Sequence, residues 1–402
     1  MFMSVLGTKG YERTIEEMKA YLGHKLGWDT PDKAPSASAL CQARRKLDAK
    51  QCRDVMAQVY RLCTTARTHA SVNYTGLRLQ AIDGTKLALP AYRCMQKHFG
   101  CPTHGAGKEQ LGPQASLVVL WDVGANQPVD WRLGRYRESE RALGQDLFAS
   151  LKPGDLLIAD RGIPSRRIIT QLSELRADFL MRIACGGLHI YSEIVPFLTQ
   201  ASNDVVIPFR LLGNSEAVPL RLLRFHLPDG SAAIFLTSLI DQQRHPYHEL
   251  VALYTQRWRI ETAFRELKLW HGLERFHARH VDGIAQEVCA MMVFQLFASE
   301  LEARARHHHQ LTIDPKNSVG GNPSPTAPPP FRLNRRIVAD CVVSLLHAGT
   351  KGDGEIQKAF DYALFRLWRY RQQPRPGRSF PRQRKSSPRG WKGRGTKGKG
   401  RP

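Results

Sequence analysis

The order of sequence patterns between residues 77 and 184 constrains the fold of this chain more than any other feature. Apolar or alternating segments of strand length recur at 77–83, 115–122, 131–136, 155–160 and 179–184. Helical patterns at 140–151 and 165–175 separate the last three of these segments. The order strand, strand, strand, helix, strand, helix, strand predicts a mixed α/β core. The segment DLLIAD (155–160) is typical of a buried central strand.

The segments around this core have different patterns. Residues 185–240 contain short strand patterns at 204–210, 218–226 and 232–236, which predict an all-β insertion after the first part of the core (76–184). A second part of the core then covers 241–310. Residues 311–331 form a Pro/Gly-rich linker, 332–372 two C-terminal helices, and 373–402 a disordered basic tail.

Residues 1–75 predict an N-terminal helical domain with helices at 12–26, 37–46 and 49–67. The middle helix ends in Arg44, Arg45 and Lys46, so it suits a DNA-reading helix of a helix-turn-helix-like unit. An ordinary three-helix bundle explains the same spacing equally well.

Charge points to a polyanionic partner. The chain has 402 residues with 59 Lys and Arg against 36 Asp and Glu, and 14 of the basic residues lie in 366–402, which contain no acid. Nucleic acid is the commonest partner of such a chain, although a protein that only coats RNA has similar charge. Eight cysteines without a CxxC pair indicate a reduced cytosolic setting, and the absence of a signal peptide or a run of about 18 apolar residues predicts no membrane association.

One helical pattern, at 254–268, has an unusual polar face. Tyr254, Arg257, Glu261 and Lys268 are spaced so that all four point the same way, and the apolar residues Leu253, Ile260, Phe264 and Leu267 fall on the adjoining stripe. Such residues often form only a solvated face with weak ion pairs. They also suit a site that holds a metal with its carboxylate and a phosphate with its cations.

Two aspartates give this second interpretation its support. Asp83 and Asp160 each follow a predicted strand, in the sequences AIDGT and IADRG, where a turn would expose the carboxylate. Aspartates at such turns are common without any function. Together with Glu261 on a helix packed beside them, however, they predict a site for Mg²⁺, which prefers oxygen ligands. Two such ions about 4 Å apart can catalyse phosphodiester displacement.

These motifs resemble those of the DDE transposases of the insertion sequence four family. Asp83, Asp160 and Glu261 match the acidic triad, and Tyr254, Arg257, Glu261 and Lys268 match the Y-R-E-K signature without a gap. The stretches RESER (137–141), LKPGDLLIADRGIPS (151–165) and PSASALCQARRKL (35–47) are similar too. The resemblance covers roughly residues 30–370 and implies an RNase H-like fold with a β-rich insertion between the second aspartate and the glutamate.

The resemblance also implies a function. We expect cut-and-paste transposition, in which Mg²⁺-dependent cleavage at the transposon ends is followed by joining of the 3′-OH to target DNA, and Mn²⁺ can replace Mg²⁺. The three acids would hold the metals, with Asp83 bridging both; Arg257 and Lys268 would grip phosphates, and Tyr254 would donate a hydrogen bond to one. Double-stranded DNA and a second copy of the chain, in a synaptic homodimer, are the expected partners, and the bacterial cytoplasm, at the nucleoid, is the expected location.

Two alternatives stay open at the level of sequence. The first is a metal-dependent nuclease on the same fold that cuts without joining. The second is a non-catalytic DNA-binding protein derived from a transposase, which has no need of acids beside phosphate.

Other chemically suggestive residues are weaker candidates. Cys94, His98, Cys101 and His104 form one short cluster in the long loop 91–113, whose spacing matches zinc fingers poorly. Asp122 also ends a predicted strand but lacks a DG or DR turn. We expect Trp258 to pack internally rather than support the DNA strand. Arg259 would support the DNA strand or pack internally, and Lys86 and His271 would have ordinary structural roles.

Overall fold

The computed structural model describes most of the chain. The described residues are 10–28, 34–65, 73–104, 109–110, 112–184, 191–213, 216–226, 232–269, 271–312 and 332–372. The predicted linker, from residue 313 on, and the predicted tail (373–402) lie outside these residues.

A single mixed sheet organises the core. Its strands are β1 (Asn73–Tyr74), β2 (Leu77–Ala88), β5 (Gln114–Asp122), β6 (Gln127–Arg135), β7 (Asp155–Ala159), β8 (Asp178–Ile183), β9 (Asp204–Arg210), β10 (Ala217–His226) and β11 (Ala232–Thr237). The order across the sheet is β6-β5-β2-β7-β8-β11-β10-β9, with β1 paired to β2. Strands β2, β7 and β8 are parallel, and the other neighbours are antiparallel. The antiparallel β6-β5-β2 unit joined to parallel β7 and β8 is the expected RNase H-like arrangement.

The segment predicted as an insertion continues this sheet. Strand β11 pairs with β8, and β10 and β9 follow outward, so all three predicted strands are confirmed. A short helix, α8 (Val195–Thr199), precedes them, so the segment is β-rich rather than all-β. The fully buried Arg221 on β10 pairs with Asp204 on β9, which compensates the buried charge.

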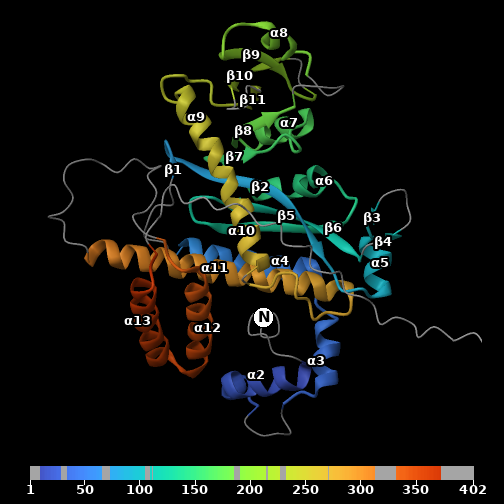
Figure 1. The fold of residues 1–402 in the computed structure, drawn as a ribbon, viewed down its shortest axis with the longest axis vertical. Helices are drawn as coiled ribbons and strands as arrows, with labels where there is room; N and C mark the ends of the chain where they lie inside the picture. The colour runs from blue at the N-terminus through green and yellow to red at the C-terminus, as the bar shows by residue number, and fades with distance from the viewer. Residues whose placement is uncertain are drawn as a thin grey trace, which may run out of the picture.

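Helices cover both faces of the sheet (Figure 1). They are α2 (Tyr11–Leu26), α3 (Ala37–Arg44), α4 (Ala49–Thr65), α5 (Arg93–Phe99), α6 (Glu140–Gln145), the 3₁₀ helix η2 (Asp146–Ser150), α7 (Arg166–Glu174), α9 (Tyr247–Tyr254), the 3₁₀ helix η3 (Thr255–Arg257), α10 (Trp258–Leu269), α11 (Val281–Thr312), α12 (Arg335–Lys351) and α13 (Asp353–Arg369). The loop 91–113 contains α5 and a small hairpin of β3 (Thr103–His104) and β4 (Glu109–Gln110).

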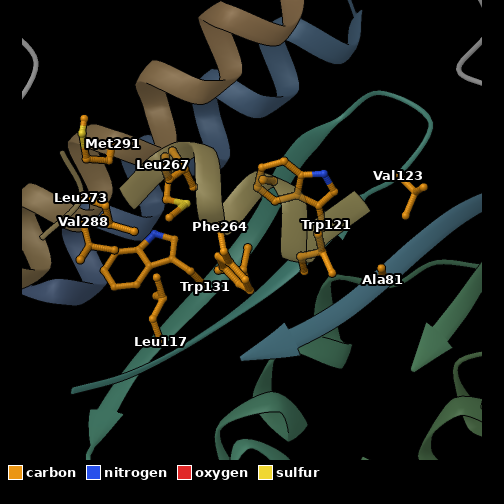
Figure 2. Packing of buried hydrophobic residues seen from close by; sticks show 14 of the residues in the cluster. Ala81, Leu117, Trp121, Val123, Trp131, Phe264, Leu267, Leu273, Val288 and Met291 are labelled. Atoms are coloured by element: carbon orange, nitrogen blue, oxygen red, sulfur yellow. The ribbon is translucent and has the colours of Figure 1, made fainter. Parts of the chain in front are cut away.

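One face of the sheet packs against α10, α11 and α4. The alternation of β2 and β5 turns Ala81, Leu117 and Trp121 to this side, and Trp131 of β6 joins them. Figure 2 shows these side chains against Phe264 and other residues of α10 and α11. The opposite face, which carries Ile82 and Val118 among others, packs against α6, η2 and α7. Each face of the central strands is therefore covered, as the apolar pattern of β7 requires.

The terminal helices divide into two groups. Helix α4 lies beside α11, and its Cys52, Met56 and Cys63 belong to the same apolar cluster as the sheet. Although it falls within the predicted N-terminal domain (1–75), α4 is thus packed as a core element. Helices α2 and α3 lie farther from the sheet, whereas α12 and α13 pack together against the C-terminal half of α11 (Figure 1).

The helix predicted at 254–268 is interrupted. The chain forms α9 up to Tyr254, one 3₁₀ turn through Arg257, and α10 from Trp258. The expected apolar stripe is nevertheless buried, because Leu253, Ile260, Phe264 and Leu267 all lie in the core. The 3₁₀ turn therefore leaves the apolar stripe buried.

Helix α11 is long and apolar enough, by length and composition alone, to cross a membrane. Its candidate span is 281–308, with a mean hydropathy of 1.3, and 78% of its most apolar window is buried inside the protein. Because core helices of soluble proteins pass the same test, this one helix is weak evidence for a membrane span.

Candidate active site

Strand register brings the two aspartates together. Strand β7 pairs with β2 up to Ile82 and Ala159, so Asp83 and Asp160 are the next residues on two adjacent parallel strands. Asp160 follows the end of β7, as predicted. The expectation that Asp83 ends its strand is wrong, because β2 continues to Ala88 while paired with β5.

Gly84, which suggested a turn after Asp83, instead allows a side chain of another element to approach the backbone of β2 closely. A Cβ at Gly84 would lie 2.5 Å from Cδ and 2.6 Å from Oε1 of Glu140. Glu140 opens α6, whose first turn is capped by the Ser139 hydroxyl, which accepts a hydrogen bond from Ala142 N at 3.1 Å. Glu140 thus enters the neighbourhood of Asp83 from the α6 face. No role was assigned to Glu140 from the sequence. Its place in the RESER stretch, directly after the helix-capping Ser139, could have identified it.

Arg257 joins the first aspartate to the glutamate. Its Nη1 donates to Asp83 Oδ2 at 3.2 Å, and its Nη2 lies 2.8 Å from Glu261 Oε1. Arg257 lies in the 3₁₀ turn η3, and its side chain is only 6% exposed. In this structure the guanidinium pairs with the two carboxylates, and its expected contact with a phosphate stays a prediction.

Tyr254 reaches the second aspartate. Its hydroxyl donates to Asp160 Oδ1 at 3.2 Å, and its ring packs 4.6 Å from the ring of Phe235 on β11. Burial, followed by the Asp160 charge, raises the pKa of Tyr254, so the hydroxyl keeps its proton as a donor. The hydroxyl proton is donated to Asp160 here, and the expected hydrogen bond to a phosphate stays a prediction.

The electrostatics of Asp83 are unusual. Burial is the largest cause that raises its pKa to about 6, and the nearby Glu140 and Glu261 carboxylates act in the same direction. The hydrogen bond from Gly84 N, at 2.9 Å, and the Arg257 charge oppose this shift. Burial and the neighbouring acids therefore outweigh the positive charge of Arg257, so the Asp83 carboxyl gives up its proton less readily than an exposed aspartate does.

Lys268 completes the expected signature farther along β2. Its ammonium donates to the carbonyl oxygen of Lys86 at 2.5 Å and lies 3.4 Å from Glu274 Oε1. Lys86 in turn donates to the Tyr136 carbonyl oxygen at 2.9 Å. Lys268 is therefore beside the strand that bears Asp83, and 23% of its side chain is exposed.

Two further residues near the site are placed differently from each other. Trp258 is 59% exposed, so the expectation that it packs internally is wrong; on the helix it lies opposite the buried Ile260 and Leu267. Arg259 Nη1 donates to the Val123 carbonyl oxygen at 3.2 Å, in line with internal support.

The basic residues that follow α3 also differ among themselves. Arg44 turns inward, where it donates to Gln286 Oε1 at 3.0 Å and lies 3.6 Å from Glu287 Oε1 on α11. Only 16% of its side chain is exposed, and its predicted DNA contact stays a prediction. Arg45 and Lys46 are exposed at the end of the helix.

The weaker candidates have structural explanations. Asp122 is buried and accepts a hydrogen bond from Ala125 N at 2.7 Å, so it closes the turn after β5. The exposed Cys94 donates its thiol to the Arg279 carbonyl oxygen at 3.2 Å. Among the described residues, no three His, Cys, Asp or Glu side chains are already gathered as ligands of a metal ion.

The three predicted acids nevertheless fit a hard cation. The Arg257 guanidinium contacts both Asp83 and Glu261, so a positive charge already lies between these two carboxylates. Asp160 adjoins Asp83 through the strand register. Oxygen donors in this number are what Mg²⁺ or Mn²⁺ prefers. Asp83, Asp160 and Glu261 would hold the ions, provided that Arg257 gives up part of its contacts.

An RNase H-like sheet with two adjacent aspartates and a glutamate from a helix across them defines a DDE-type catalytic domain. Comparison with known proteins agrees. Residues 74–294, more than half of the chain, match the family described as "Transposase DDE domain", and the chain belongs to this family. The matched range contains the acidic triad and the complete Y-R-E-K signature, and the predicted resemblance to this family is confirmed.

Individual relatives are similar over part of their length. "Transposase InsG for insertion sequence element IS4" of Escherichia coli (strain K12) is 28% identical over 250 residues, which cover 60% of this chain and 55% of that protein. "Putative transposase InsL for insertion sequence element IS186A" of the same strain is 24% identical over 246 residues, or 51% and 60%. The matched regions therefore span less than two thirds of these relatives.

A likeness among solved structures is weaker. The "piggyBac transposase synaptic complex with hairpin DNA" covers 86% of this chain and 67% of that chain, with 10% identity and a TM-score of 0.42. This likeness is too low to support an inference about the site.

Proposed function

We propose that this protein is a Mg²⁺-dependent transposase that cleaves DNA at the ends of a mobile element and transfers the freed 3′-OH to target DNA. The observation that supports this most is the meeting of Asp83, Asp160 and Glu261 around the Tyr254–Arg257 pair. When bound, divalent ions would activate the attacking oxygen and stabilise the leaving one.

The side chains of the site have separable tasks in this proposal. Asp83, Asp160 and Glu261 bind the cations; Tyr254 orients Asp160 through its hydroxyl proton, and Arg257 holds Asp83 and Glu261 near each other while they lack metal. Lys268, which is partly exposed beside β2, is the cation of the signature best placed to contact a phosphate.

The direct test supplies linear DNA that carries the element's own terminal inverted repeats, together with Mg²⁺ and a target plasmid. The proposal predicts nicks at the repeat ends and joined products, and predicts neither for Asp160→Ala. Nicks without joined products would favour a nuclease, and binding without nicks a non-catalytic DNA-binding protein. We also propose that two copies of the chain bring two transposon ends together, which sedimentation of the protein–DNA complex would test. The proposed location at the nucleoid would be tested by cell fractionation.

Arg45 and Lys46 are proposed to contact phosphates of the terminal DNA. Each is exposed, whereas Arg44 is bound to α11. Replacing either by alanine should weaken DNA binding for all sequences and reduce the slope of log K against log salt by about one. Arg44→Ala is the matched control: it should lower stability and leave the salt slope unchanged. Equal slopes in all three variants would remove this helix end from the DNA interface.

A further inference from the structure

A fourth carboxylate lies beside the acidic triad. The Glu140 side chain covers Gly84 so closely that its Cγ, Cδ and Oε1 all fall within 2.7 Å of where a Cβ would stand. Gly84 directly follows Asp83 on β2, so the fold brings an acid from α6 against the backbone of the central metal-ligand candidate. The missing side chain of Gly84 makes this approach possible.

The surroundings of Glu140 contrast with those of the other acids. Asp83 and Glu261 share the Arg257 guanidinium, Asp160 accepts the Tyr254 hydroxyl, and the neighbouring Glu138 accepts the Arg135 N–H at 3.0 Å. Within the described part of the chain, the half-buried Glu140 carboxylate makes no hydrogen bond or ion pair. An acid set beside the buried carboxyl of Asp83 costs free energy unless a cation compensates it.

We propose that Glu140 is a further ligand of the divalent-cation site, on the α6 side of Asp83. This inference rests on the proposed function, because it assumes that the triad binds Mg²⁺ or Mn²⁺. The Arg257 guanidinium already lies between Asp83 and Glu261. Glu140 adds a further negative charge, and none of the described basic side chains is paired with it. A divalent ion at Asp83 would supply the missing charge.

The test uses the full-length protein without DNA and compares three proteins: wild type, Glu140→Gln and Glu138→Gln. Melting temperature is measured in EDTA and in Mn²⁺ or Mg²⁺ titrations, since binding to the folded state alone raises stability with metal concentration. We expect Glu140→Gln to raise the melting temperature in EDTA, because an uncompensated charge is removed, and to weaken the apparent metal affinity about tenfold. Glu138→Gln, the matched control two residues away, should bind metal as the wild type does.

The outcomes separate this inference from the proposed function. If the wild type shows no metal-dependent shift and no cleavage, the proposed function fails. If the wild type shifts and cleaves while Glu140→Gln binds metal equally well, only the inference is overturned. A lower melting temperature in EDTA with unchanged metal affinity would also overturn it, since that marks a packing role. Should Glu140→Gln fail to fold, Glu140→Asp keeps the charge and is expected to bind metal more weakly than wild type.

Discussion

The acidic side chains on the two sides of β2 differ in whether a basic side chain is paired with them. On the α10 side, Asp83 and Glu261 are bound to the buried Arg257. On the α6 side, Glu140 presses against Gly84 without such a partner among the described residues. The contrast teaches that the site is electrostatically compensated on one side only. In the proposed function, a divalent cation would complete the side that has no such partner.

The largest expected effect comes from removing the compensation on the α10 side. Arg257→Met takes away a nearly buried charge that holds two carboxylates. Breaking such a pair costs about 4 kcal/mol, because the remaining charges are left uncompensated. Urea denaturation in EDTA measures this loss. The control Arg259→Met, on the same helix but bound to one carbonyl oxygen, should lose about 1 kcal/mol or less. Equal losses would erase the contrast.

A smaller effect follows from the pKa of Asp83. Because burial and the neighbouring acids raise this pKa to about 6, the folded state holds the proton more tightly than the unfolded state does. The resulting stability is fully present below about pH 4 and is lost as pH rises through 6. The free energy of unfolding of the metal-free wild type should therefore fall, relative to Asp83→Asn, by about 3 kcal/mol between pH 4 and 7.

The exposed Asp54→Asn variant is the control for this titration. If the Asp83→Asn difference changes no more with pH than the Asp54→Asn difference does, the raised pKa of Asp83 and the one-sided compensation around β2 are refuted.

The smallest effect on stability is expected on the α6 side. Gly84→Ala places a methyl group against the flexible end of Glu140, which can move away, so unfolding should change by about 1 kcal/mol or less. Metal affinity should fall as in Glu140→Gln, and the double variant should be no weaker than either single one, because both changes act through one carboxylate. Gly354→Ala, with open space around its Cβ, is the control. A loss of several kcal/mol would mean that backbone crowding dominates at Gly84.

Sequence patterns predicted the core and the triad because both depend on short-range signals. Alternating or apolar segments of strand length located β2, β5 and β6, and the apolar stripe from Leu253 to Leu267 identified the α10 surface that packs on the sheet. The two aspartates could be paired because neighbouring parallel strands end at one edge. The Y-R-E-K spacing then linked them to Glu261.

The misplaced features depend on tertiary contacts that local patterns do not contain. Gly84 resembles a turn residue until the approach of α6 is known. Arg44 and Arg45 look alike in the sequence until Gln286 and Glu287 of α11 are found beside Arg44. In each case, a residue far away in the sequence decides the role.

The most direct test replaces one hard oxygen ligand of the proposed metal site by a softer sulfur ligand. Asp160→Cys replaces a carboxylate by a thiolate, which Mg²⁺ binds poorly and Mn²⁺ binds better. We predict that Asp160→Cys does not cleave terminal-repeat DNA in Mg²⁺ and regains part of its cleavage in Mn²⁺, while Asp160→Ala stays inactive in both. Undiminished cleavage by Asp160→Ala in Mg²⁺ would contradict the central claim that Asp83, Asp160 and Glu261 form one metal-binding catalytic site.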